Sequence, residues 1–250
     1  MIPYPRQERL ARTMLLYSRE EMEKLWEAHV MVFGLGGVGS YAAEALCRAG
    51  IGRLTLVDAD CVEASNLNRQ LPALHSTVGK AKVAVVRERL LDIAPDAAIK
   101  AVQAFHLPDD PVPIPQDTTC VVDAIDTVAA KLDLAVTCRE RSIPMIACMG
   151  MGNRMDPTKI CIGDIFETSA CPLCRVMRRE LRKRAVTALR CVYSTEAAHV
   201  PCAEQEQPLQ QKKTGRPAPG SLPFVPSVAG LYMAYEVIRS ICKQEETSIK

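Results

Sequence analysis

Glycine and aspartate residues with the spacing of a nucleotide-binding turn lie near the start of the chain. Four glycines in the pattern G-x-G-G-x-G follow the apolar residues 30–33, namely Gly34, Gly36, Gly37 and Gly39. Glycines let the backbone turn tightly and approach a phosphate, and the helix that follows presents free N–H groups with a partial positive charge. Asp58 ends a second apolar run about 20 residues later, where a carboxylate can hold a ribose hydroxyl. The spacing therefore predicts a nucleotide site rather than an ordinary strand-to-helix turn.

A further set of polar residues favours ATP over NAD as the nucleotide. The set lies in the loop after Asp58, near the start of a predicted helix and after a later strand: Asp60, Asn66, Arg69, Gln70, Lys82 and Asp126. Arginine and lysine can neutralise the charge that develops when a nucleophile attacks the α-phosphate, and an asparagine can polarise an α-phosphate oxygen. A carboxylate such as Asp126 can hold the Mg²⁺ that bridges phosphates. Hydride transfer to NAD needs none of these side chains, so adenylation is the predicted chemistry.

Asp123 and Asp126 follow the fourth predicted strand of the chain. Ligands of an open parallel sheet bind at the carboxyl ends of its strands, so both carboxylates are expected to face the same crevice as Asp58. Asp126 also precedes a predicted helix, and it can serve as the N-cap of that helix instead of, or in addition to, binding a ligand.

Strands and helices alternate along the first 150 residues. Short apolar runs predict strands at residues 30–33, 53–57, 98–105, 119–124 and 144–148. Helices are predicted between them at residues 40–48, within the segment 73–94 where residues 78–82 open a long helix, and at residues 128–141. Further strands at 159–165 and 189–194 flank a basic helix at 174–186, and the last predicted helix is at 224–242. The predicted fold class is α/β, a Rossmann-like doubly wound, mostly parallel sheet with additional antiparallel strands in the C-terminal part.

The sequence divides into three parts that are expected to form one domain. An N-terminal helical arm covers residues 1–28, a Rossmann-like ATP-binding half covers residues 29–152, and the C-terminal part covers residues 153–250. Residues 8–27 are predicted as one amphipathic helix of the arm, which carries Arg12. Residues 202–220 are polar and proline-rich, which predicts a mobile loop.

Arginines dominate the basic helix of the C-terminal part. They repeat at helical spacing and are expected to form one cationic face: Arg175, Arg178, Arg179 and Arg182. Such a face can bind the phosphate backbone of a nucleic acid, and an ordinary solvated surface is the alternative.

Composition excludes some classes of protein without selecting one. The chain has 250 residues and a formal net charge of +2, so bulk charge does not identify a partner. It contains no apolar run long enough to span a membrane and no secretory signal at its start. Its 11 cysteines are scattered through predicted strands and helices, which is typical of reduced thiols in a cytoplasmic protein rather than of a disulfide framework.

The motifs of the predicted site resemble a known superfamily. Five of them carry the resemblance: GLGGVGS, the D-x-D of Asp58 and Asp60, N-x-x-R-Q at residues 66–70, G-x-x-K at residues 79–82, and D-x-x-D at residues 123–126. Together they resemble the ubiquitin-activating-enzyme-like superfamily, which includes ThiF and MoeB. Its members are Mg·ATP-dependent adenylyltransferases that activate a carboxylate.

Within that superfamily the chain is most similar to the tRNA threonylcarbamoyladenosine dehydratases. The similarity covers nearly the whole chain and rests on R-x-x-R-T at residues 9–13, VDAIDTVAAKLDL, the D-P-T after the second glycine turn, CPLCRVMRRELRKR, VYSTE and PGSLPFVPSVAGL. The resemblance implies ATP and Mg²⁺ as cofactors, a tRNA bearing threonylcarbamoyladenosine as substrate, and a homodimer. It leaves sulfur-relay proteins open as further partners.

The resemblance also implies a role for each site residue. Asp58 would bind the ribose with Asp60 beside it, and Asn66, Arg69 and Lys82 would hold the phosphates. Asp126 would bind the magnesium ion, and Arg12 would reach the ATP site of the partner subunit. The implied reaction is adenylation of the side-chain carboxylate of the modified adenosine, followed by ring closure that releases AMP.

Other functions stay open at this point. The nearest is activation of the C-terminus of a sulfur-carrier protein, as ThiF and MoeB relatives perform. Those relatives pair one C-x-x-C motif with a second as a zinc site, whereas this chain has only Cys171 and Cys174 and no second pair near its C-terminus. Cys191 and Cys202 are candidates to complete four zinc ligands, although a single C-x-x-C that opens a basic helix is more often incidental. An NAD-dependent oxidoreductase and a non-catalytic RNA-binding scaffold are the remaining alternatives.

Overall fold

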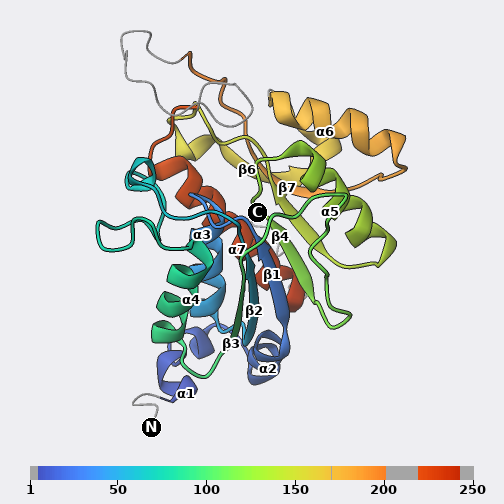
Figure 1. The fold of residues 1–250 in the computed structure, drawn as a ribbon. Helices are drawn as coiled ribbons and strands as arrows, with labels where there is room; N and C mark the ends of the chain where they lie inside the picture. Colours follow the sequence, from blue (N-terminus) through green and yellow to red (C-terminus); the bar gives the residue numbers. More distant parts are fainter. Residues whose placement is uncertain (1–4, 170, 201–218, 243–250) are drawn as a thin grey trace.

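A single seven-stranded sheet organises the molecule. The computed structural model describes residues 5–169, 171–200 and 219–242. The strands are β1 (His29–Phe33), β2 (Arg53–Val57), β3 (Ala98–Val102), β4 (Cys120–Asp123), β5 (Met145–Cys148), β6 (Ile160–Asp164) and β7 (Arg190–Ser194). Their order in the sheet is β3-β2-β1-β4-β5-β7-β6 (Figure 1). All neighbouring strands run parallel except β6, which is antiparallel to β7. The Rossmann-like α/β prediction is confirmed.

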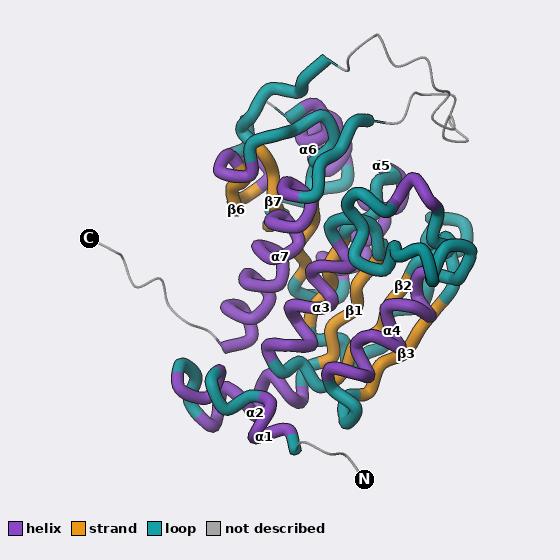
Figure 2. The backbone as a smooth tube through the Cα atoms, turned by 90° about the vertical axis from the view of Figure 1, so that its left-hand side faces the viewer, coloured by secondary structure: helices purple, strands orange, loops and turns teal. Residues whose placement is uncertain are grey.

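Helices cover both faces of this sheet. The longer ones are α3 (Gly39–Ala49), α4 (Lys82–Ile93), α5 (Val128–Glu140), α6 (Pro172–Lys183) and α7 (Phe224–Cys242). Figure 2 shows α7, α3 and α4 side by side across one face, where they share a core with β1 and β2. The other face is covered by α5, and α6 packs with α5 over β5 and β7. Every residue of β1 is buried, as expected for a central parallel strand covered on both sides.

The chain order places a switch point beside the glycine turn. From β1 the chain continues to β2 and β3 on one side, whereas β4 and β5 lie on the other side of β1. In sheets of this kind ligands bind in the crevice at the carboxyl ends of the strands, where the order reverses. The residues that follow β1, β2 and β4 all meet at this edge.

The single helix predicted for residues 8–27 is wrong, because the arm is broken into pieces. It contains α1 (Arg6–Arg9), a short 3-10 helix (Thr13–Leu15) and α2 (Arg19–Glu27). Ser18 starts α2 as its N-cap: its hydroxyl accepts the N–H of Glu21 at 3.2 Å, and the Glu21 carboxylate accepts the N–H of Ser18 at 2.7 Å. Such a capping box fixes a helix start and cannot lie inside a continuous helix.

Two other predicted boundaries can be compared with the structure. The helix that residues 78–82 were predicted to open begins at Lys82, after Gly79, which has a φ of +88°. The strand predicted at 98–105 ends at Val102. Most of the predicted loop at 202–220, including Cys202, lies outside the described residues.

The cysteines and the helices of the described residues can be compared with the expectations from composition. Ten cysteines lie in the described part of the chain, and all of them are free thiols, most of them buried. Among the same residues, the helices are too short or too polar to cross a bilayer.

Candidate functional site

The glycine turn joins β1 to α3 at the carboxyl edge of the sheet. Gly34 has a φ of +85°, and a Cβ atom there would lie 2.7 Å from the carbonyl oxygen of Ala124 after β4. A Cβ atom on Gly39, the first residue of α3, would lie 1.8 Å from the Gly34 carbonyl oxygen. Both positions therefore require glycine, and the tight turn places the N-terminus of α3 at the carboxyl edge of the sheet.

Asp58 is fixed beside this turn at the end of β2. Its two carboxylate oxygens accept the N–H of Leu35 at 2.6 Å and the N–H of Asp60 at 2.8 Å. Burial raises the pKa of Asp58 above its ordinary value, and nearby Lys82 opposes that effect. The carboxylate is therefore held next to the backbone that a nucleotide would approach.

Lys82 and Asp60 tie the start of α4 to the same edge. The Lys82 ammonium lies 2.9 Å from the Asp60 carboxylate, and the Lys82 side chain is only 6% exposed while that of Asp60 is 56% exposed. The backbone N–H of Lys82 also donates to the Asp60 carbonyl oxygen at 3.0 Å. A buried cation with its partner at the protein surface is well placed to interact with a bound phosphate.

Asn66, Arg69 and Gln70 follow in the loop between β2 and α4. The amide of Asn66 is buried and shapes the loop, because its oxygen accepts the N–H of Glu63 at 3.2 Å. Arg69 donates to the Ser65 carbonyl oxygen at 2.9 Å and to the Asn68 amide oxygen at 2.8 Å, and burial lowers its pKa. A Cβ atom on Gly36 would lie 3.8 Å from the Gln70 amide nitrogen. The structure thus brings the predicted phosphate-binding residues to the glycine turn.

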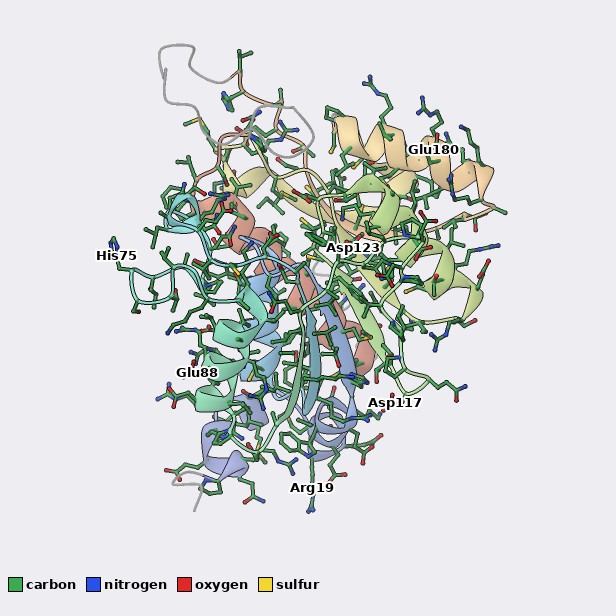
Figure 3. The ribbon with its side chains drawn as sticks, in the orientation of Figure 1. Arg19, His75, Glu88, Asp117, Asp123 and Glu180 are labelled. Atoms are coloured by element: carbon green, nitrogen blue, oxygen red, sulfur yellow. The ribbon has the colours of Figure 1, made fainter. Side chains whose placement is uncertain are left out.

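The two carboxylates after β4 differ in their surroundings, which corrects one expectation. Asp126 is exposed at the carboxyl edge, as predicted. Asp123 is fully buried and does not face the crevice: its carboxylate pairs with Lys131 of α5 at 2.9 Å and accepts the N–H of Ile125 at 3.1 Å. Burial raises the pKa of Asp123, and Lys131 acts in the opposite direction. Figure 3 shows Asp123 in the interior of the molecule.

The Asp123–Lys131 ion pair fixes the turn that carries Asp126. The sequence analysis did not predict this ion pair. We expect Lys131→Met to lower the free energy of unfolding by about 3–5 kcal/mol, because it leaves a buried carboxylate without its partner. Urea unfolding monitored by circular dichroism would measure this loss. The double variant with Asp123→Asn should recover part of it, and a single-variant loss below about 1 kcal/mol would show that the pair is not needed to hold the turn.

Arg12 is not brought to this crevice within one chain. It is exposed in the arm, which packs at the amino ends of the strands (Figure 1). Leu10 contacts Gly50 before β2, and Arg9 pairs with Asp96 and donates to the Ile93 carbonyl oxygen at the end of α4. Arg12 therefore lies at the opposite edge of the sheet from Asp58 and Lys82.

The arginines of α6 are not equivalent. Arg175 and Arg179 are exposed, and Arg182 is exposed over the ring of Phe166 at 5.3 Å. Arg178 instead donates to the backbone oxygen of Thr168 at 2.9 Å and to its hydroxyl at 2.5 Å, so it anchors α6 to the preceding loop. Figure 3 shows Glu180 of α6 at the outer surface, away from the sheet. The cationic face is therefore formed by three of the four predicted arginines.

Cys171 and Cys174 share the first turn of α6, where both are buried. Across the described residues no three His, Cys, Asp or Glu side chains are grouped as metal ligands. Cys191 is therefore not joined to the pair as a third ligand, and Cys202 lies outside the described residues.

Comparison with known proteins agrees with this geometry. The sequence pattern of the ThiF family matches residues 9–250. The chain belongs to the ThiF family.

Individual ThiF-family relatives differ in how much of this chain they match. The tRNA threonylcarbamoyladenosine dehydratase of Bacillus subtilis is 38% identical over 94% of this chain and 95% of its own. The crystal structure of the Escherichia coli enzyme of that name, TcdA, in complex with ATP has a TM-score of 0.82, at 33% identity over 95% of both chains. The molybdopterin-synthase adenylyltransferase of Escherichia coli is 36% identical over 57% of this chain and 60% of its own.

Proposed function

We propose that this protein is an ATP-dependent tRNA threonylcarbamoyladenosine dehydratase. The observation that carries the proposal is the end-to-end similarity to the Bacillus subtilis dehydratase, which extends through the C-terminal part. The similarity to the molybdopterin-synthase adenylyltransferase covers much less of the chain, so activation of a sulfur-carrier protein is the weaker alternative. The substrate and the free thiols both fit a cytoplasmic enzyme.

The reaction has two steps that the crevice can support. First, the carboxylate of the threonylcarbamoyl side chain attacks the α-phosphate of ATP, and pyrophosphate leaves. The carbamoyl group of the same side chain then attacks the activated carbonyl carbon, AMP leaves, and the ring closes with net loss of water from the nucleoside. Neither step requires a thioester with the enzyme.

Each site residue has a part in these steps. Asp58 accepts hydrogen bonds from the ribose, and the N-terminus of α3 faces the phosphates. Lys82 and Arg69 neutralise the charge that develops at the α-phosphate and on the leaving pyrophosphate, and Asn66 lies in the same loop. Asp126 fits a magnesium ion because it is an exposed carboxylate at the carboxyl edge of β4. When bound, Mg²⁺ would supply charge neutralisation between the phosphates.

A homodimer would complete the site with Arg12. The arm carries strongly exposed apolar side chains, Leu15 and Leu16, which are 83% and 82% exposed. Helix α7, which packs beside α2, exposes Leu231 and Tyr235. Exposing these apolar side chains to water is unfavourable in a monomer, whereas a second copy of the chain would bury them. Arg12 in this arm would then enter the crevice of the partner subunit.

The decisive test of the function is a reaction with defined substrate. Purified protein, Mg·ATP and tRNA bearing threonylcarbamoyladenosine are incubated, and the nucleosides are analysed by mass spectrometry. We expect a product lighter than the substrate nucleoside by one water, together with AMP and pyrophosphate. A protein that instead adenylates a sulfur-carrier C-terminus and leaves the nucleoside unchanged would disprove the proposal.

The exposed arginines of α6 are expected to bind the tRNA backbone. Arg175→Glu with Arg179→Glu should weaken tRNA binding and reduce the slope of log affinity against log salt by about two, because each lost phosphate contact lowers it by about one. ATP affinity should stay the same. The charge-matched control is Lys100→Glu with Arg139→Glu, two exposed cations on other elements. Equal effects of the two double variants would show that net charge, not α6, is responsible.

A further inference from the structure

One buried arginine in the loop after β5 has nitrogen atoms without an acceptor among the described residues. Arg154 is only 3% exposed, and its Nε and Nη1 atoms have no hydrogen-bond partner among the described residues. No carboxylate in that part of the chain forms an ion pair with it. The buried lysines Lys82 and Lys131 differ from it in this respect, since each lies 2.9 Å from a carboxylate. Arg154 is thus a buried cation without an ion-pair partner in the part of the chain that the structure describes.

The backbone on both sides of Arg154 is firmly held. Asn153 donates its N–H to the Gly220 carbonyl oxygen at 2.7 Å, and its side-chain oxygen accepts the N–H of Gly220 at 2.6 Å. On the other side, the N–H groups of Met155 and Asp156 both donate to the carboxylate of Glu196 at 3.1 Å. The D-P-T and VYSTE motifs therefore act together to hold this loop in place.

The loop lies on the β5 side of the switch point. It follows β5, which is the neighbour of β4, the strand that precedes Asp126. Ser221, one residue after Gly220, accepts a hydrogen bond from the Asn68 side chain at 2.9 Å. Residues 220–221 thus connect the Arg154 loop to the loop that carries Asn66 and Arg69. The proposed ribose and phosphate ligands follow β1 and β2, and the Arg154 loop follows β5 on the other side of β1.

The chemistry of the guanidinium selects an anion as its partner. A guanidinium keeps its charge inside a protein, so burial without a counter-ion is unfavourable. Its planar donors match the two oxygens of a carboxylate. The phosphates of ATP are already supplied with Lys82, Arg69 and the α3 N-terminus. The remaining anion of the proposed reaction is the substrate carboxylate that attacks the α-phosphate.

We propose that Arg154 binds the carboxylate of the threonylcarbamoyl side chain and thereby distinguishes modified tRNA from unmodified tRNA. This inference rests on the proposed function and adds a substrate-binding residue to it. Arg154 would hold the attacking carboxylate in line with the α-phosphate while Lys82 and Arg69 hold the nucleotide.

The test compares two tRNAs that differ only in the threonylcarbamoyl group. Binding of each is measured with wild type and with Arg154→Met, without ATP. We expect Arg154→Met to bind the modified tRNA about tenfold to a hundredfold more weakly, because the substitution removes a charge-assisted hydrogen bond. Its affinity for the unmodified tRNA should not change. Arg154→Lys should recover part of the loss.

Thermal unfolding separates this role from a structural one. We expect Arg154→Met to unfold at the same temperature as wild type or higher, because it removes an unpaired buried charge. Arg141 provides the matched control, since its guanidinium donates to the Ile114 carbonyl oxygen at 2.6 Å and to that of Pro115 at 3.1 Å. Arg141→Met should lower the unfolding temperature and leave the preference for modified tRNA intact.

Several outcomes would overturn the inference. Equal weakening for both tRNAs would mean that Arg154 binds a tRNA phosphate. Unchanged binding, or a fall in unfolding temperature like that of Arg141→Met, would mean that Arg154 is structural. Wild-type protein that neither prefers modified tRNA nor cyclises it would disprove the proposed function and this inference with it. If wild type cyclises the modified tRNA and the Arg154→Met variant binds that tRNA as tightly as wild type, the inference is disproved and the proposed function stands.

Discussion

Asp126→Ala should reduce formation of the cyclised nucleoside by about a hundredfold or more. The reason is that Asp126 is the carboxylate proposed to hold Mg²⁺, and a metal ion that neutralises phosphate charge contributes several kcal/mol to transition-state stabilisation. The carboxylate is exposed at the end of β4, on the turn that the buried Asp123–Lys131 pair fixes. The rate of AMP release with modified tRNA measures the effect.

Isothermal titration shows whether the loss of activity is caused by weaker Mg²⁺ binding. With Mg²⁺ present, Asp126→Ala should bind ATP more weakly than wild type, and with a chelator the two should bind alike. Asp109→Ala is the matched control, because Asp109 is an exposed aspartate in the proline-rich loop before β4 and should bind ATP as wild type does. If Asp126→Ala weakens ATP binding equally with and without Mg²⁺, the residue contacts the nucleotide directly. Tight binding of NAD without any response to ATP would contradict the assignment of the nucleotide.

The sequence was sufficient for the parts of the fold that have a local chemical signature. The strand, glycine turn, helix and second strand ending at Asp58 were all predictable, because glycine spacing and apolar runs are local properties. The start of α2 at Ser18 was predictable in principle, since Ser18 and Glu21 have capping-box spacing, but an apolar stripe across residues 8–27 suggested one helix. The strand at 98–105 was predicted too long, although the backbone pairs with β2 only as far as Val102.

The errors at the site concern contacts between distant residues. Asp123 and Asp126 have the same side chain and lie three residues apart, yet one is buried on Lys131 and the other is exposed. Arg178 has the same helical spacing as its neighbours and is nevertheless bound to Thr168. Arg154 has no motif of its own beyond a basic residue between a glycine turn and D-P-T. Its signature is the absence of a counter-ion among the described residues, which only the three-dimensional structure reveals.

The position of Arg12 makes the dimer proposal testable through catalysis. Within one chain Arg12 lies with the arm at the amino ends of the strands, and Lys82 lies at the carboxyl edge beside Asp60. The two residues can serve one active site only if they come from different subunits. An arginine supplied in this way can accelerate phosphoryl chemistry by about a thousandfold or more. We therefore expect Arg12→Ala and Lys82→Ala to be nearly inactive as separate proteins.

Mixing the two inactive variants should restore activity. After subunit exchange at equal concentrations, about half of the dimers contain one subunit of each kind. In such a dimer, one site combines an intact Lys82 with an intact Arg12 from the partner, and the other site lacks both. One good site in half of the dimers corresponds to about a quarter of wild-type activity, measured as cyclised nucleoside formed per minute. Exchange is verified by native mass spectrometry with one variant isotopically labelled. Labelled heterodimers without recovered activity would mean that Arg12 has no part in the partner's site, because an arginine acting within its own chain gives no intact site in any mixed dimer.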